Sequence, residues 1–119
     1  MKRTFLYGLL LVIGLFSFYG KPGQIFQTSL RVTVLNELGN TVQDAKVTLY
    51  KTEEDYKAEK NAVESKNTDA KGVLFFDGLE PKEYYIYAEK GDRNNAGGGE
   101  KTEVLKKDRV NKINVVITE

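Results

Sequence analysis

The chain has 119 residues, 18 of them basic and 17 acidic, and it contains neither histidine nor cysteine. These two absences exclude an imidazole base, a Ser-His-Asp triad, disulfides and the usual ligands of zinc and copper. The near balance of charge argues against a nucleic-acid surface, which needs a basic excess. Oxygen ligation of calcium or magnesium is the metal chemistry that this composition leaves open.

The first twenty residues differ from the rest. Lys2 and Arg3 precede an apolar stretch from Phe5 to Phe18, which is the pattern of a secretory signal peptide. The stretch is shorter than the roughly 20 residues of a spanning helix, so a retained anchor is the second interpretation and a buried core helix the third. We therefore predict a signal peptide over residues 1–20, a spacer over 21–28 and a domain over 29–119, in a protein that is periplasmic, cell-surface or secreted. Membrane contact is expected only through an uncleaved N-terminal segment.

Most of the domain has a hydrophobic period of two, which is typical of strands with one buried face. Gly39, Gly72 and Gly78 mark turns between these segments, and the Asn- and Gly-rich stretch 91–99 is expected to be a loop. The predicted strands are Leu30 to Val34, Ala45 to Leu49, Val73 to Phe76, Tyr84 to Glu89, the short Val104–Leu105 and Ile113 to Ile117.

The charged segment after the second predicted strand breaks this period. Thr52 stands three residues before Asp55, as in a capping box, and Glu53 and Lys57 are four apart, as in a helical ion pair. The pattern predicts a short exposed helix near Glu53 to Lys60, with a solvated charged loop as the alternative. Adjacent acids on such a helix are typical of a solvated face rather than of catalytic carboxylates, which need a cleft and one raised pKa.

Short strands separated by turns favour an all-β fold over alternating βαβ units. We predict an antiparallel Greek-key sandwich of about seven short strands, with one short exposed helix after the second strand.

Three segments carry a family resemblance: Val42 to Leu49, Thr68 to Pro81 and Tyr84 to Glu89. The second segment contains Thr-Asp, Gly, Phe and Leu-x-Pro in that order. The three segments resemble carboxypeptidase regulatory-like domains, and the similarity extends over residues 29–119. The resemblance implies a transthyretin-like β-sandwich and a non-catalytic accessory module that acts alone, in an assembly or on another protein. Transthyretin-related hydrolases depend on histidines, so a small hydrolase is disfavoured.

The same resemblance raises an internal crosslink. Related collagen-adhesin B-type modules carry a Lys–Asn isopeptide bond promoted by a buried acid, which by position would be Glu89. Val34 and Leu35 stand where the lysine would be expected, so no such bond is predicted.

A calcium loop is a weak candidate site. Asp92, Asn94 and Glu103 stand at positions 1, 3 and 12 of a calcium-loop pattern, with Gly97 at position 6. Ala96 supplies no side-chain oxygen at position 5, and the flanking segments are predicted strands instead of helices. A flexible hairpin loop without a cofactor is the favoured interpretation.

Aromatic residues are the candidate partner contacts. Tyr85 and Tyr87, with Phe75, would form an exposed stripe for a peptide or glycan if they face outward. The alternative is structural, because strands favour aromatic residues for cross-strand packing. The function we predict is an exported non-catalytic module that binds or assembles with a protein or glycan at the cell envelope, and the alternative is a purely structural or self-associating subunit.

Overall fold

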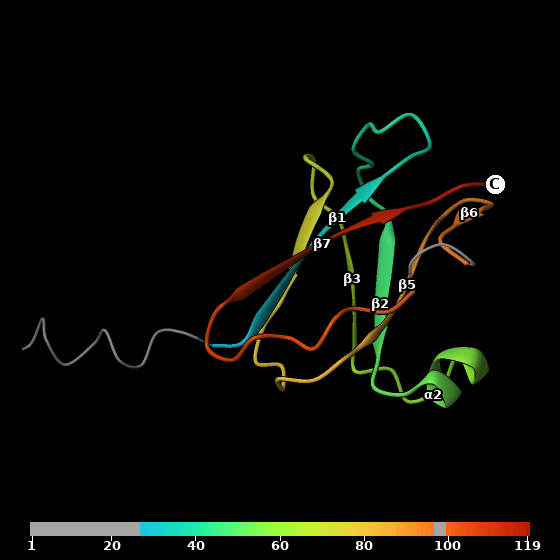
Figure 1. Ribbon diagram of the computed structural model, residues 1–119. Coiled ribbons are helices and arrows are strands. Elements are labelled where there is room, and N and C mark those ends of the chain that lie inside the picture. Colours follow the sequence, from blue (N-terminus) through green and yellow to red (C-terminus); the bar gives the residue numbers. More distant parts are fainter. Residues whose placement is uncertain (1–26, 97–99) are drawn as a thin grey trace, which may run out of the picture.

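The computed structural model describes residues 27–96 and 100–119, so the predicted signal peptide lies outside the described residues, as do residues 21–26 of the spacer. Two β-sheets face each other across one core (Figure 1), with strand orders β4-β1-β7 and β3-β2-β5-β6. This confirms the predicted all-β sandwich. The elements are β1 (Ser29–Leu35), β2 (Lys46–Tyr50), α2 (Glu53–Ala58), β3 (Glu64–Asn67), β4 (Val73–Phe76), β5 (Tyr85–Lys90), β6 (Arg93–Asn94) and β7 (Val110–Val116).

The core follows from the alternation of side chains along each strand. Successive residues point to opposite faces, so Leu30, Val32 and Val34 of β1 turn inward while Arg31 and Thr33 turn outward. The other strands contribute in the same way, and both sheets supply apolar side chains to one cluster. Its buried members are Leu30, Val32, Val34, Ala45, Val47, Leu49, Leu74, Phe76, Tyr84, Ile86, Ala88, Leu105, Val115 and Ile117.

One strand pair departs from the predicted antiparallel arrangement. β1 and β7 run parallel over their whole length, from Ser29 beside Val110 to Leu35 beside Val116. The alternation of apolar residues is the same in either direction, so the sequence pattern carries no information on strand direction. The chain between the two strands builds the rest of the sandwich and thereby provides the long connection that parallel neighbours require.

Three local predictions were wrong. The expected strand at Val104–Leu105 is absent: Val104 is 60% exposed, while Leu105 is buried and its N–H donates to the Lys82 carbonyl at 3.1 Å. Two short strands, β3 and β6, form in segments for which no strand was predicted. Both are polar edge strands held by backbone pairing with β2 and β5, so they show no apolar period.

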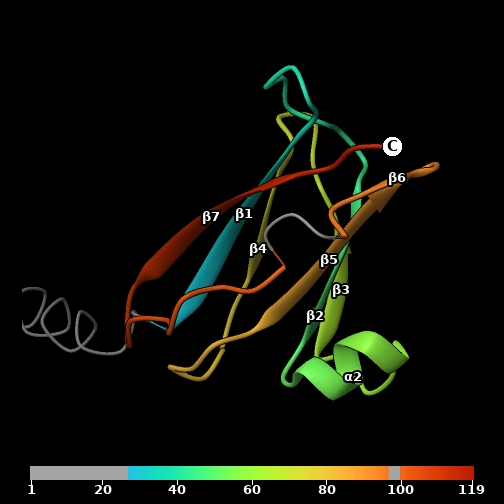
Figure 2. The same cartoon turned by 45° about the vertical axis from the view of Figure 1, so that its right-hand side comes forward.

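The predicted helix is confirmed. Figure 2 shows α2 beside the four-stranded sheet, and the Tyr56 ring packs against tyrosine rings of β2 and β5. The N-cap of α2 is Thr52, whose Oγ1 accepts a hydrogen bond from the Asp55 N–H at 3.0 Å. Glu53 and Lys57 form the expected ion pair at 3.2 Å. Within residues 27–96 and 100–119, no helix is long and apolar enough to cross a membrane.

The turn into β4 is fixed by a carboxylate and a glycine. Asp69 Oδ1 accepts hydrogen bonds from the N–H groups of Lys71 and Val73, which lower the pKa of Asp69. Gly72 has φ +76°, and a Cβ placed there would lie 2.8 Å from the Cβ of Thr41. Gly72 is therefore required both for its backbone conformation and for the close approach of the preceding hairpin.

Candidate interaction surface

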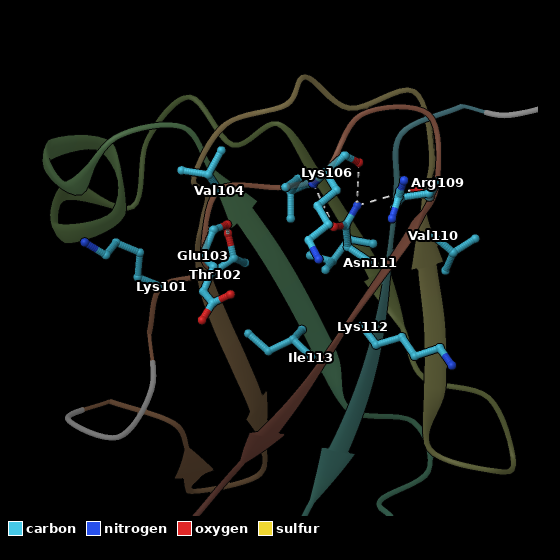
Figure 3. Close-up of a pocket in the computed structure, with 12 residues that line it drawn as sticks. Lys101, Thr102, Glu103, Val104, Lys106, Arg109, Val110, Asn111, Lys112 and Ile113 are labelled. Atoms are coloured by element: carbon cyan, nitrogen blue, oxygen red, sulfur yellow. Dashed lines mark hydrogen bonds between the residues drawn. The ribbon is translucent and has the colours of Figure 1, made fainter.

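A groove lies along the free side of β7, the last strand of the three-stranded sheet (Figure 3). Its volume is about 660 Å³, within the size range of ligand sites. One wall is β7 from Val110 to Ile113, and the other is the irregular segment 101–106. Figure 3 shows Lys112 and Ile113 leaving β7 on opposite sides, and both residues line the groove, so the strand contributes one charged and one apolar side chain to it.

Asn111 fixes the width of this groove at one end. Its Oδ1 accepts from the Lys106 N–H at 2.8 Å, and its Nδ2 donates to the Lys106 carbonyl at 3.1 Å. The same amide group donates to the Ser29 carbonyl at 3.1 Å. One side chain thus joins the loop segment, β7 and β1, and the groove is formed before any ligand arrives.

The groove is basic. Lys106, Arg109 and Lys112 line it, and none of the three makes an ion pair with any residue that the structure describes. Lys101 also lines it but pairs with Glu83 at 3.7 Å, and Glu103 is the one carboxylate in the lining. In the sequence, Asp108 stands among the cations Lys106, Lys107 and Arg109. Asp108 does not line the groove, whereas Lys101 and Lys112, which stand outside that charged run, do.

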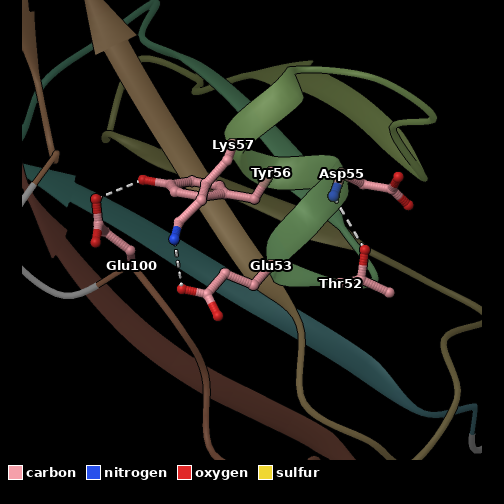
Figure 4. Close-up of polar contacts among 6 residues, drawn as sticks. All are labelled: Thr52, Glu53, Asp55, Tyr56, Lys57 and Glu100. Atoms are coloured by element: carbon pink, nitrogen blue, oxygen red, sulfur yellow. Dashed lines mark hydrogen bonds and ion pairs between the residues drawn. The ribbon is translucent and has the colours of Figure 1, made fainter.

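The predicted aromatic stripe is covered on the four-stranded sheet. The Tyr56 ring of α2 lies 5.9 Å from the rings of Tyr50 and Tyr85 and 6.4 Å from that of Tyr87. Its hydroxyl donates to Glu100 Oε2 at 2.6 Å (Figure 4). Tyr85 and Tyr87 are consequently half-buried, and they do not form an open platform.

The same packing favours the neutral phenols of Tyr50, Tyr56 and Tyr87 by raising their pKa values. Burial is the main cause that raises the pKa of Tyr56, and the hydrogen bond to Glu100 and its charge add to it. Burial also raises the pKa of Tyr50 and Tyr87, with smaller contributions from the charges of Glu59 and Glu89. The cluster is therefore a packing unit that holds the helix on the sheet.

Phe75 does not join the two tyrosines. It lies on β4 with 43% of its surface exposed, on the outer face of the three-stranded sheet, while Leu74 and Phe76 point into the core. Tyr85 and Tyr87 lie on the outer face of the other sheet, so the core separates them from Phe75. The expectation of one stripe from all three was wrong, because the sequence does not show which sheet each strand joins.

The structure shows no calcium site formed by Asp92, Asn94 and Glu103 among the residues that it describes. Asn94 is in β6, and its Oδ1 accepts from the Ala96 N–H at 2.9 Å, while Glu103 belongs to the wall of the groove. The middle of the loop, residues 97–99, lies outside the described residues. Among those described, no group of three or more acidic side chains could hold a metal ion. Asp92 is exposed and belongs to no such group.

Asn95 is a structural residue that the sequence pattern missed. It is 1% exposed, its Oδ1 accepts from the Ala88 N–H at 2.9 Å, and its Nδ2 donates to the Ile86 carbonyl at 3.0 Å. The side chain continues the pairing of β5 where β6 ends. Asn95 stands in an Asn- and Gly-rich stretch, and this composition by itself indicates only a flexible loop.

The position proposed for a crosslinking acid faces away from the core. Glu89 lies on the same side of β5 as Tyr85 and Tyr87, and the inward residue beside it is Ala88. Val34 and Val115 are neighbours in the β1–β7 pair and fill the core there.

No protein-family model and no curated protein matches the sequence. Solved structures that are similar in fold include a streptococcal ancillary pilin (TM-score 0.60, 12% identity, 79% of this chain and 33% of that chain), the pilus 2b backbone protein of group B streptococcus (0.57, 14%, 76% and 40%) and the major pilin subunit of Bacillus cereus (0.54, 13%, 78% and 30%). The chain thus corresponds to less than half the length of these proteins. At such identities the likeness shows the fold alone, which is the β-sandwich found in pilin subunits.

Proposed function

We propose that this chain is an exported, non-catalytic structural module of the cell envelope, held in an assembly by contacts with other proteins. The observation that carries the proposal is the use of the buried polar side chains. Six polar residues are buried among those described, all are uncharged, and each is engaged in a hydrogen bond that holds the fold. They are Thr28, Ser29, Thr48, Thr68, Asn95 and Thr102.

Two of these residues illustrate the point. Thr68 Oγ1 accepts from the Ala45 N–H at 2.9 Å and donates to the Val42 carbonyl at 2.7 Å, so it joins two chain segments. Thr28 Oγ1 accepts from the Asp108 N–H at 2.9 Å and fixes the start of the domain to the loop before β7. Catalytic groups typically have perturbed surroundings in a cleft, whereas both of these hydroxyls bond to the backbone of the fold.

The solved neighbours support a structural role. They are a pilus backbone protein, an ancillary pilin and a major pilin subunit. The present sandwich has the size of one part of such a subunit. The strand and turn pattern shared with carboxypeptidase regulatory-like domains, which are accessory modules, supports the same assignment.

The proposal of export rests on the sequence pattern of residues 1–20. The lack of cysteine is compatible with it, because a fold without disulfides is stable in oxidising and reducing compartments alike. A glycan-binding platform is the weaker candidate, because Tyr56 covers the tyrosines that would form it. A protein partner is better supported, since the basic groove beside β7 is open.

The test is expression of the full chain, with a C-terminal tag, in a bacterial host. We expect the protein in the envelope or medium with a new N-terminus near residue 21, and crosslinking in that fraction should give products with other proteins. A control variant, Lys2→Glu with Arg3→Glu, removes the positive start of the signal and should keep the protein inside the cell. Cytoplasmic wild-type protein that forms no crosslinked product would refute the proposal.

A further inference from the structure

β7 has an edge on which the backbone is unpaired. The Arg109 carbonyl accepts from the Ser29 N–H, and the Ile117 N–H donates to the Leu35 carbonyl. The backbone N–H and carbonyl groups of the odd-numbered residues of β7 therefore point toward β1. The N–H and carbonyl of Thr118 point the other way and pair with Asn94 of β6. By the same alternation, the backbone groups of Val110, Lys112, Asn114 and Val116 point to the free side. They have no partner among the residues that the structure describes.

The other sheet edges in the described structure are protected. The Phe75 carbonyl on the edge of β4 accepts a hydrogen bond from Lys66 Nζ at 2.7 Å. β3 has four residues of polar type, and β6 has two. Short strands and lysines are the usual means by which proteins prevent unwanted edge pairing. β7 has seven residues, and Val110 and Val116 on it are 50% and 41% exposed.

The charges around this edge select one kind of strand. Lys106, Arg109 and Lys112 are cations without ion-pair partners in the described residues, against the single carboxylate of Glu103 in the groove. A second basic strand would be repelled, whereas carboxylates on an incoming strand would find opposite charges nearby. Such complementarity mainly sets specificity and the rate of association.

We propose that the free edge of β7 binds an extended acidic segment of a partner protein, which adds as a further strand to the three-stranded sheet and lies in the groove beside residues 101–106. The backbone groups of Val110, Lys112 and Asn114 supply hydrogen bonds to that segment, and Ile113 and Leu105 give it an apolar floor. This mode of recognition derives affinity from the main chain and specificity from alternate side chains. The inference rests on the proposed function, because it identifies the surface through which the module joins its assembly.

Asn114 offers a sharp test. Its N–H points to the free edge, so Asn114→Pro blocks an added strand without removing a bond of the β1–β7 ladder, and proline is tolerated on such edges. Asn114→Ala is the matched control. The probe is a labelled eight-residue peptide of alternating Glu and Val, measured by fluorescence anisotropy. We expect saturable binding to the wild type that weakens with added salt, a loss of about tenfold or more in Asn114→Pro and little change in Asn114→Ala.

Charge and backbone are tested separately. Lys106→Glu with Lys112→Glu should weaken binding by at least about tenfold, while Lys107→Glu, at an exposed site outside the groove lining, should not. The same peptide with Lys in place of Glu should bind more weakly. A peptide N-methylated at alternate residues on its pairing edge should lose binding, and this result does not depend on the folding of any protein variant.

Three results would overturn the inference: equal binding of the acidic and basic peptides, undiminished binding of the N-methylated peptide, or no saturable binding at millimolar peptide. Self-association of the protein alone that Asn114→Pro abolishes would also overturn it, because a second copy would then occupy the edge. If envelope crosslinks persist in Asn114→Pro, the structural function stands and only this surface is wrong. If the wild type gives no crosslinks but binds the acidic peptide, the function fails and the surface stands.

Discussion

Asn95 is expected to matter far more for stability than its neighbour Asn94, although both lie in a stretch that reads as loop. Truncation in Asn95→Ala leaves the Ala88 N–H and the Ile86 carbonyl without their side-chain partners. A buried backbone group that loses its partner costs about 1–3 kcal/mol. With about 1–2 kcal/mol lost for each of the two groups, the free energy of unfolding should fall by about 2–4 kcal/mol, a large part of the roughly 5–15 kcal/mol of a typical domain.

Asn94→Ala is the matched control. Its side chain accepts one exposed hydrogen bond from the Ala96 N–H, and its backbone pairing with Thr118 remains after truncation. We expect a loss below about 1 kcal/mol. Urea denaturation followed by tyrosine fluorescence measures both variants, and thermal unfolding should show a drop of about 10–25 °C for Asn95→Ala. Equal losses for the two variants would refute the assignment of Asn95 as a structural bridge.

Asn95→Asp adds a test with a direction in pH. The ionised carboxylate can still accept from the Ala88 N–H, but it faces the Ile86 carbonyl, to which the native amide donates. Burial and this carbonyl favour the protonated form in the folded state, so the introduced group should have a pKa above the unfolded value of about 3.9. The variant should thus recover stability relative to the wild type as the pH falls toward 4. A deficit that is constant with pH would contradict this arrangement.

Three further predictions concern turns and ionisation. Gly72→Ala should destabilise more than Gly91→Ala, because both have positive φ but only Gly72 has a Cβ clash, at 2.8 Å from Thr41; equal losses in denaturation would argue against the close approach. In absorbance titration, Tyr56→Phe should remove the latest-ionising phenol. The pKa values of Tyr50, Tyr56 and Tyr87 are raised in the folded state, so the stabilisation that these neutral phenols give should be fully present below a pH of about 10 and be lost above it. A free energy of unfolding that stays constant above that pH would refute the packing of the cluster. Asp69→Asn should destabilise at neutral pH but converge with the wild type as the pH falls below about 4, because hydrogen bonds lower the pKa of Asp69; a constant difference would contradict this.

Some features follow from local chemistry and were predictable. The alternation at Leu30, Val32 and Val34 identifies an inward face for any strand of that composition, and the structure buries these side chains. Thr52 and Asp55 specify a helix start through a hydrogen bond between residues three apart. Such signals depend only on near neighbours in the chain, so a single sequence contains them in full.

Other features depend on pairing between distant segments. The parallel pairing of β1 with β7, the placement of Phe75 and Tyr85 on different sheets and the burial of Asn95 each involve partners that no local pattern names. The basic groove is of the same kind, since one of its walls is a loop segment that the Asn111 side chain joins to β7. The sequence by itself determined which side chains are apolar and where the chain can turn. The tertiary structure decided which edge is left open, because the free energy of packing two sheets depends on the whole set of strands at once.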